Sequence, residues 1–220
     1  MVKVLIIGGH GKVALLLAPL LKEAGVEVTS VIRNPAHIDE VAQCGATPVL
    51  ADLVTSSVEE LSELFTGYDA VIWAAGAGGG SAERTYAVDR DAAIASIDAA
   101  EAANVPRFLM VSYLGAGPDH GVPPENSFYA YAQAKAAADA HLRASTLGWT
   151  ILAPGTLTLD APTGLIDPTP AARRAPGGSS GTSRANTALV VAAALQDAET
   201  ILRTIEFSDG QVPIAQAIAP

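Results

Sequence analysis

The chain has 220 residues, half of them hydrophobic, and a formal charge of −10 at neutral pH. A chain of this size suits one domain, and its negative charge would repel a phosphate backbone, which argues against nucleic acid as a partner. The single cysteine, Cys44, excludes an internal disulfide framework. The first apolar run reaches glycine too soon to span a membrane or to form a secretion signal, so we expect a cytoplasmic protein.

Short apolar runs alternate with longer helical stretches along most of the chain. The runs are apolar throughout, which is typical of strands buried on both faces of a parallel sheet. We therefore predict an α/β fold, a Rossmann-type doubly wound parallel sheet with helices on both faces, in a single domain over residues 1–220. The predicted helices cover 12–24, 35–43, 57–65, 82–103, 127–147 and 184–195, and the predicted strands are VKVLIIG, VEVTSVIR, ATPVLAD, YDAVIWAAG, PRFLMVS and WTILAPG.

The composition changes near residue 156, where proline, glycine and small polar residues become frequent. We interpret about 156–182 as a short, loop-rich substrate flap and not as a second domain. The final stretch TIEFSDGQVPIAQAIA predicts a short strand, a turn and a terminal helix that could close the far edge of the sheet.

The stretch GGHGKVA follows the first predicted strand and opens a helix. Such a turn lets backbone amides approach a pyrophosphate at the positive end of the helix, although glycines can also simply end a strand. His10 fits a loop residue or a neighbour of the phosphates better than a catalyst. The expected cofactor contacts here are Gly8, His10, Gly11, Lys12 and Val13.

Arg33, in SVIRNP at the end of the second strand, indicates which dinucleotide is bound. A carboxylate at this point holds the ribose hydroxyls of NAD, whereas an arginine accommodates the 2′-phosphate of NADP. Arg33 therefore favours NADP over NAD, which stays possible, and the alternative is a plain surface arginine.

The third and fourth strands end in further candidate contacts. Asp52 could accept a hydrogen bond from the adenine amino group beside Leu53, or it could only cap the following turn. Small residues in WAAGAGGG would let the backbone lie against the cofactor sugars. We assign that role to Ala74, Ala75 and Gly76, because flexible linkage alone would explain the glycines at 78–80.

Tyr131 and Lys135, in FYAYAQAK, lie four residues apart in a predicted helix and so share one face. A nearby ammonium can acidify a phenol, but an alanine-rich helix could also simply bury Tyr131 in the core. Ser112 ends the fifth strand, where its hydroxyl could hydrogen-bond a substrate carbonyl. Tyr113, the next residue, could be a pocket wall or a competing proton donor.

Together the stretches GGHGKVA, DL, AAGA, YAQAK, APGTLT and SRANTA, with Ser112 and the ending DGQVPIAQAI, resemble the short-chain dehydrogenases/reductases. The resemblance is to the compact, atypical NAD(P)H-binding kind, which is similar to NAD-dependent epimerases/dehydratases. It implies that Tyr131 gives or takes the proton on a substrate oxygen while hydride moves to or from the nicotinamide. It also implies that Lys135 bridges the nicotinamide ribose and lowers the pKa of the Tyr131 phenol, beside Ser112. Further cofactor contacts implied by the resemblance are Pro154, Gly155 and Thr156.

These features predict an NADP-dependent oxidoreductase that acts on a small carbonyl or quinone-like compound. The alternatives are a non-catalytic NADP(H)-binding redox sensor or regulator and, third, an epimerase/dehydratase-like isomerase, which the short flap disfavours because a sugar nucleotide would have little to grip. No Cys and His cluster has metal-ligand spacing, so we expect no metal. We expect a small-molecule substrate, no nucleic-acid or membrane partner, and a monomer or homodimer.

Overall fold

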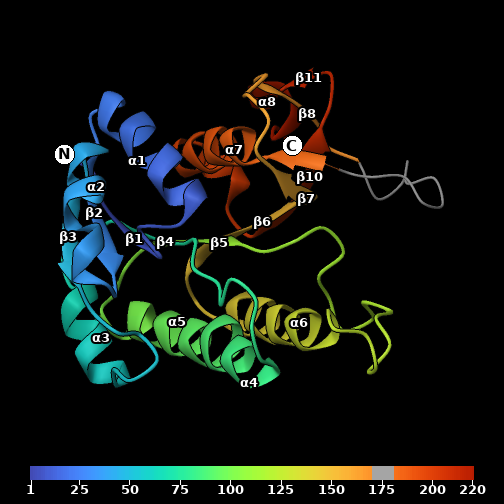
Figure 1. Cartoon of the computed structure of the whole chain (residues 1–220). Coiled ribbons are helices and arrows are strands. Elements are labelled where there is room, and N and C mark those ends of the chain that lie inside the picture. The colour runs from blue at the N-terminus through green and yellow to red at the C-terminus, as the bar shows by residue number, and fades with distance from the viewer. Residues whose placement is uncertain (170–180) are drawn as a thin grey trace.

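A nine-stranded sheet forms the centre of the computed structural model, which describes residues 1–169 and 181–220 (Figure 1). Its order is β11-β8-β10-β6-β5-β4-β1-β2-β3, and the strands from β10 to β3 are parallel. The chain winds outward from β1 in both directions, which confirms the predicted doubly wound Rossmann-type fold. The parallel strands are β1 (Lys3–Ile7), β2 (Glu27–Ile32), β3 (Thr47–Leu50), β4 (Ala70–Trp73), β5 (Arg107–Val111), β6 (Gly148–Pro154) and β10 (Arg203–Asp209).

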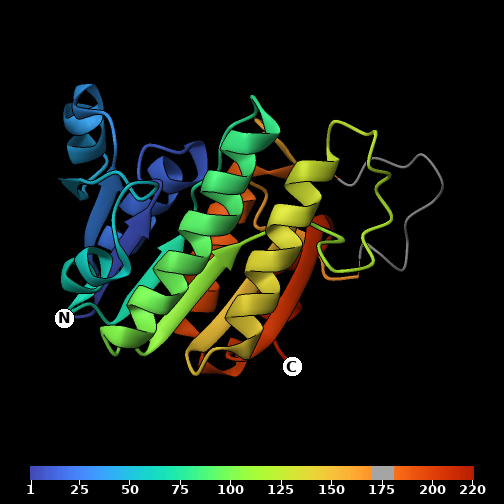
Figure 2. The same ribbon diagram turned by 90° about the horizontal axis from the view of Figure 1, so that it is seen from below.

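Helices cover both faces of the sheet. Helices α1 and α7 pack together on one face, while α3, α5 and α6 cover the other, where α5 and α6 lie side by side (Figure 2). No helix of the described ranges is both long enough and apolar enough to cross a bilayer. The helices are α1 (Lys12–Glu23), α2 (Ile38–Gln43), α3 (Val58–Phe65), α4 (Ala82–Thr85), α5 (Ala93–Ala102), α6 (Tyr129–Ala144), α7 (Arg184–Gln196) and α8 (Ile214–Ala217).

Several of these helices have distinctive starts or junctions. A capping box, in which Ser57 and Glu60 exchange side-chain and backbone hydrogen bonds, starts α3. A 3₁₀ turn at Pro35–His37 precedes α2. The predicted helix 82–103 is continuous but irregular, because a π-helical segment at Tyr86–Ala92 joins α4 to α5.

The alternating directions of strand side chains build two cores, one on each face. In β1, Val4 and Ile6 face the core formed with α1 and α7, whereas Leu5 and Ile7 face the core formed with α3 and α5. All four side chains are fully buried. This arrangement explains why the strand is apolar at every position, and burial of this kind is the main favourable contribution to folding.

Two antiparallel strands extend the sheet beyond β10, namely β8 (Leu165–Asp167) and β11 (Val212–Pro213). The prediction that the final segment closes this edge is confirmed by β10, β11 and α8. The described part of the proposed flap contains more structure than a loop, since β7 (Thr156–Thr158) also pairs with β9 (Gly181–Ser183). Residues 170–180 of that flap lie outside the described ranges.

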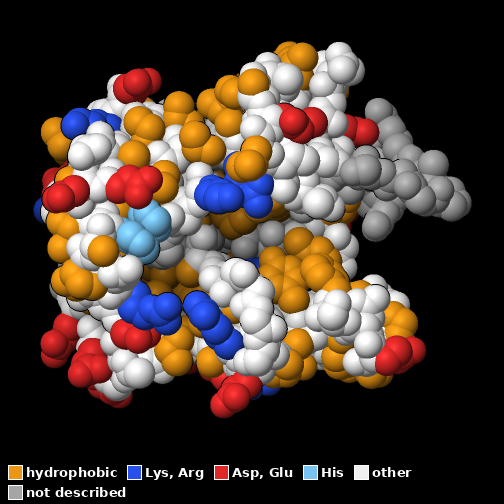
Figure 3. All heavy atoms as spheres, in the orientation of Figure 1, with side chains coloured by type: hydrophobic (Ala, Val, Ile, Leu, Met, Phe, Trp, Pro, Cys, Tyr) orange, Lys and Arg blue, Asp and Glu red, His pale blue; other side chains and the backbone are white. Residues whose placement is uncertain are grey.

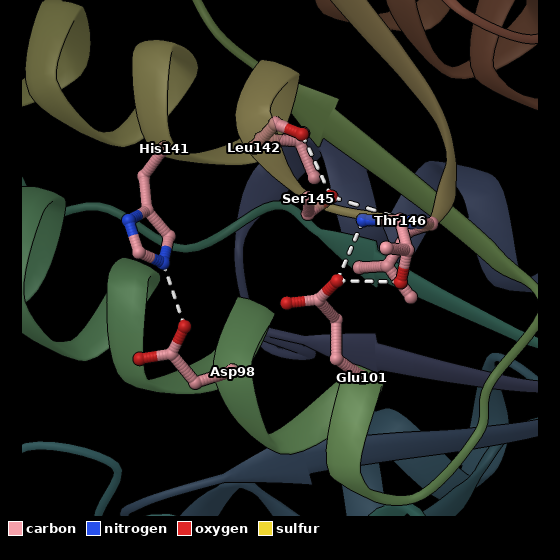
Figure 4. Close-up of polar contacts among 7 residues, drawn as sticks. Asp98, Glu101, His141, Leu142, Ser145 and Thr146 are labelled. Carbon is pink, nitrogen blue, oxygen red and sulfur yellow. Dashed lines mark hydrogen bonds and ion pairs between the residues drawn. The ribbon is translucent and has the colours of Figure 1, made fainter.

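Polar contacts join α6, and the turn that follows it, to α5 (Figure 4). His141 Nε2 lies 2.6 Å from Asp98 Oδ1, which joins the two helices. One oxygen of Glu101 accepts hydrogen bonds from the Thr146 amide and hydroxyl, at 2.6 and 2.7 Å, and Ser145 Oγ donates to the Leu142 carbonyl. These contacts hold the face of α6 that carries Tyr131 and Lys135 toward the sheet.

Candidate active site

A cavity of about 310 Å³ lies at the carboxyl ends of β1 to β4. The direction of winding reverses between β1 and β4, and ligands bind at this point in doubly wound folds. The space-filling view shows a hollow between the two helix layers, with Lys and Arg side chains on its rims and His at one end (Figure 3). The structure brings nine of the predicted contacts together here: Gly8, His10, Gly11, Arg33, Asp52, Leu53, Ala74, Ala75 and Gly76.

Gly8 allows the ends of β1 and β4 to approach each other closely. Its φ of +80° favours glycine, and a Cβ at this position would lie 2.6 Å from the Ala75 Cα. The Gly11 amide then donates to the Gly8 carbonyl at 2.7 Å and closes the turn. The cavity floor is therefore backbone, which a ligand can approach without meeting a side chain.

The start of α1 has the properties of an anion-binding helix end. Gly11 supplies no side-chain cap, the first turn contains no acidic residue, and the amides of Lys12, Val13 and Ala14 have no hydrogen-bond partner among the described residues. Free amides at the positive end of a helix suit a pyrophosphate. Lys12 is exposed and Val13 is buried, and neither side chain lines the cavity. These residues fit a dinucleotide through their backbone.

Arg33 and Asp52 lie on the wall formed by β2 and β3. The Arg33 guanidinium is exposed and has no hydrogen bond or ion pair within the described part of the chain. Asp52 accepts a hydrogen bond from the Val54 amide at 3.1 Å, so it caps the turn after β3. This is the simpler of the two roles considered for Asp52, and the neighbouring Leu53 lines the cavity in either case.

The sequence interpretation missed several residues of this cavity. His10 stacks on His37 with ring centroids 3.4 Å apart, and His10 Nε2 lies 2.7 Å from Glu40 Oε2. Arg84 of α4 also lines the cavity, and its position shortly after three glycines could have suggested this. No cluster of three or more His, Cys, Asp and Glu side chains in the described ranges could hold a metal. The additional lining residues include Asn34, His37, Val54, Trp73, Arg84 and Val88.

A second cavity, of about 480 Å³, lies at the carboxyl ends of β5 and β6, on the same edge of the sheet. Pro154, Gly155 and Thr156 line this cavity and not the first one. One wall is aromatic, because the rings of Tyr113 and Phe128 line it, and Tyr131 packs on both at 5.5 and 5.1 Å. The remaining lining residues are Leu114, Gly115, His120, Val122 and Leu157.

The environment of Tyr131 differs from that implied by the family resemblance. Burial, followed by the carboxylates of Asp89 and Asp139, raises the pKa of the Tyr131 phenol above its ordinary value. Its hydroxyl has no hydrogen-bond partner among the described residues. The direction of this shift is opposite to the one that the resemblance implies, and Lys135 is not among its causes.

Lys135 is one of the most deeply buried polar residues, with 1% of its surface exposed. Its Nζ donates to the Val111 carbonyl at 2.8 Å and lies 3.5 Å from Met110 Sδ. Burial lowers the pKa of Lys135, while Asp139 and Asp89 oppose that shift. Lys135 lines neither cavity, and its bond to Val111 supports the end of β5.

Ser112 also faces inward. Its Oγ donates to Asp139 Oδ2 at 2.6 Å, and Asp139 lies four residues after Lys135 on the same face of α6. The other carboxylate oxygen, Oδ1, is buried without a partner in the described structure. Nearby, Asp89 accepts a hydrogen bond from the Ala77 amide at 3.0 Å, and burial raises the pKa values of both carboxyls. The spacing of four residues from Lys135 could have identified Asp139 as a neighbour of the candidate site. No comparable pattern in the sequence points to Asp89.

The doubly wound sheet, the glycine turn, the free amides of α1 and the cavity between β1 and β4 define a Rossmann-type dinucleotide-binding protein. A family model described as NAD(P)H-binding matches residues 8–198. The chain thus belongs to the NAD(P)H-binding family, of the atypical short-chain dehydrogenase/reductase kind.

Relatives of similar length support this assignment. The chain is 34% identical to the "Uncharacterized sugar epimerase YhfK" of Bacillus subtilis over 98% of both chains. It is 32% identical to the UPF0659 protein YMR090W of Saccharomyces cerevisiae over 98% of this chain and 97% of the relative. A solved structure from Bacillus halodurans, named "Putative NAD-dependent epimerase/dehydratase", shares 33% identity with a TM-score of 0.89 over 99% of each chain.

Proposed function

We propose that the protein is an NADP-dependent oxidoreductase that transfers hydride between NADPH and a small carbonyl or quinone-like compound. The observation that carries the proposal is the convergence of nine predicted cofactor contacts on one cavity, next to an aromatic-walled cavity on the same sheet edge. The nicotinamide would supply or accept the hydride. The residues of the chain would bind, orient and protonate the reactants.

In this proposal the first cavity holds the adenosine and pyrophosphate portions of the cofactor. The free amides at the start of α1 bind the pyrophosphate, and Arg33 pairs with the 2′-phosphate of the ribose. Because Arg33 has no competing partner in the described structure, its charge is available to a ligand. This supports NADP as the preferred cofactor.

The second cavity would hold the substrate. A flat ring could pack against Phe128 and Tyr113, since aromatic rings favour offset or edge-to-face contacts at these spacings. Tyr131 lines neither cavity but packs directly behind both rings, and in this proposal it would exchange the proton with the substrate oxygen. The Tyr131 phenol carries the proton that reduction of a carbonyl substrate requires.

A non-catalytic NADP(H) sensor is a second candidate, favoured by one specific observation. Lys135 is bonded to the Val111 carbonyl and Ser112 to Asp139, so both groups are occupied inside the protein. A protein that only binds the dinucleotide would need neither group in the cavity. It would keep the glycine turn and Arg33.

The name of the Bacillus subtilis relative suggests epimerisation of a sugar, and that of the Bacillus halodurans protein suggests epimerisation or dehydration. The second cavity gives this reading less support, because its walls are formed by aromatic, aliphatic and glycine residues together with His120 and Thr156. A sugar requires several directed hydrogen bonds, which such walls supply sparsely. We therefore rank the isomerase third.

Two measurements test the proposal. Fluorescence titration with NADPH and NADH establishes whether a dinucleotide binds and which one is preferred. A screen of quinones, aldehydes and small ketones, followed by NADPH absorbance, establishes turnover. Tight NADPH binding with turnover supports the oxidoreductase, binding without any turnover favours the sensor, and absence of binding to either nucleotide rules out both.

A further inference from the structure

A second cation, besides Arg33, lines the cofactor cavity. Arg84 belongs to α4 and lines the same cavity, although the two arginines come from segments after different strands, β4 and β2. The same cavity is lined by Leu53 and Val54 after β3 and by Val88, one helical turn beyond Arg84. This portion of the cavity is apolar, as an adenine ring requires.

Neither guanidinium has an ion-pair partner within the described part of the chain. Arg84 uses only its backbone amide, which donates to Ser81 Oγ at 3.2 Å. The chain has 23 acidic residues against 13 lysines and arginines, yet no carboxylate of the described residues pairs with either guanidinium. Two exposed cations that share a cavity repel each other until an anion lies between them, and an anion there would gain from both.

The chain that carries Arg84 takes a path that glycine makes possible. Gly78, Gly79 and Gly80 have φ values of +69°, +89° and +109°, which side chains rarely adopt. A Cβ at Gly80 would lie 3.9 Å from Arg84 Cδ, so the arginine side chain passes beside this run. Before the run, the Ala77 amide is held by the buried Asp89. The three glycines therefore do more than link β4 to α4. They turn the chain between the Ala77 amide, which Asp89 holds, and Arg84.

We propose that Arg84 is a specificity-determining residue that binds the 2′-phosphate of the adenosine ribose together with Arg33. The proposal rests on the proposed function in that it takes NADP(H) as the ligand. The pyrophosphate already has the free amides of α1, whereas a 2′-phosphate carries nearly two negative charges and requires its own partners. Arginine presents a planar fork of donors that suits phosphate oxygens.

The test is a titration of the wild type, Arg84→Ala, Arg33→Ala and the double variant with NADPH and NADH. Arg84→Ala is expected to weaken NADPH binding by about 10-fold and NADH binding by less than about 2-fold. Because both arginines would grip one phosphate, the double variant should deviate from the product of the single effects. Adenosine 2′,5′-bisphosphate and AMP, as competitors, should show the same contrast without the nicotinamide.

Arg90→Ala is the matched control. This substitution removes the same charge from the same helical segment. The Arg90 guanidinium, however, is bonded to Asp91 at 2.6 Å and lies 4.6 Å from the centre of the Tyr86 ring, and Arg90 does not line the cavity. Circular dichroism verifies that each variant is folded, and Arg84→Gln serves as a second substitution that keeps length without charge.

Three results would overturn the proposal. An effect of Arg84→Ala on NADPH no larger than that of Arg90→Ala would remove Arg84 from the site. Equal losses for NADPH and NADH would assign Arg84 to the pyrophosphate or the adenine. Failure of the wild type to bind either nucleotide would reject the proposed function together with this inference, whereas the first two results leave the proposed function intact.

Discussion

The Ser112 hydroxyl donates its proton to Asp139 Oδ2 at 2.6 Å, within the interior and away from solvent. A serine hydroxyl has one proton to donate and two lone pairs to accept with. While this hydrogen bond holds, Ser112 can accept from a ligand but cannot donate to a substrate carbonyl. Protonation of Asp139 would let the carboxyl become the donor and free the Ser112 proton.

The pKa of Asp139 makes the stability of the protein depend on pH. Burial raises this pKa above its ordinary value of about 3.9, so the folded state holds the proton more tightly than the unfolded state. The resulting stabilisation is present below pH of about 3.9 and is lost as pH rises through the folded pKa. In Asp139→Asn we expect the unfolding free energy to fall less steeply over that window, by up to about 1.4 kcal/mol per pH unit. Urea unfolding at a series of pH values measures it.

Glu101 should behave in the opposite way and serves as the control. Its hydrogen bonds from Thr146 lower the pKa of its carboxyl, so its stabilisation is present above the ordinary value of about 4.3 and is lost as pH falls (Figure 4). Glu101→Gln should therefore reduce the loss of stability on acidification. Identical pH slopes for the wild type and both variants would show that neither carboxyl titrates as the structure implies.

Lys135 is expected to contribute to stability. Lys135→Met keeps the size of the side chain but removes the donor to the Val111 carbonyl and the cation near Asp139 and Asp89. Removal of one partner from a buried charged group typically costs roughly 3 kcal/mol, which denaturant unfolding would detect. Addition of Asp139→Asn should recover part of that loss, because it also removes an unpaired charge.

The same variant distinguishes a structural from a cofactor role for Lys135. If the lysine supports only β5, folded Lys135→Met should bind NADPH as the wild type does. A large loss of affinity would instead show that Lys135 reaches the nicotinamide ribose once the cofactor is present, as the family resemblance implies.

Tyr131 is the proposed proton donor, and Tyr129 provides a control on the same helix. Tyr131→Phe should leave NADPH binding nearly unchanged and lower turnover of an accepted carbonyl substrate by roughly 10²- to 10⁴-fold. Tyr129→Phe, whose ring packs on His120 at 5.8 Å, should have little effect on turnover. Full turnover by Tyr131→Phe would refute the assignment, and Tyr113→Phe would then be the next variant to measure.

A comparison of Gly8 with Gly67 separates two costs of replacing a glycine: the clash of an added Cβ and the backbone strain of a positive φ. Both have positive φ values, +80° and +86°, but a Cβ at Gly8 meets the Ala75 backbone whereas a Cβ at Gly67 meets nothing within 4 Å. Gly67→Ala should therefore cost only about 1 to 2 kcal/mol of backbone strain. Gly8→Ala should destabilise the protein by more and abolish NADPH binding, as thermal unfolding and titration would show. Equal effects of the two substitutions would contradict the close approach of β1 and β4.

The fold could be predicted because its signals are local. The apolar strands and the glycine turn at Gly8 each depend on a few neighbouring residues. The short strands β7, β8 and β9 were not predicted, since pairing with distant partners, and not their own composition, makes them strands.

The candidate site could be predicted only in part. Residues at strand ends, such as Arg33 and Ala75, lie where the doubly wound order places them. The direction of the Lys135 and Ser112 side chains depends on how α6 packs on the sheet and on Asp139, a partner 27 residues from Ser112. The sequence pattern gives the face that Tyr131 and Lys135 share but not the depth at which each is buried. For that reason the effect of burial on the Tyr131 pKa was missed.

The two outermost strands of the sheet share a feature with a consequence for association. In the described structure β3, of four residues, and β11, of two, form the edges, and each contains a proline, Pro48 and Pro213. A proline has no amide hydrogen to offer to an added strand, and short edges offer few other groups. We therefore expect both open ends of this apolar sheet to be poor templates for the addition of a strand from another molecule.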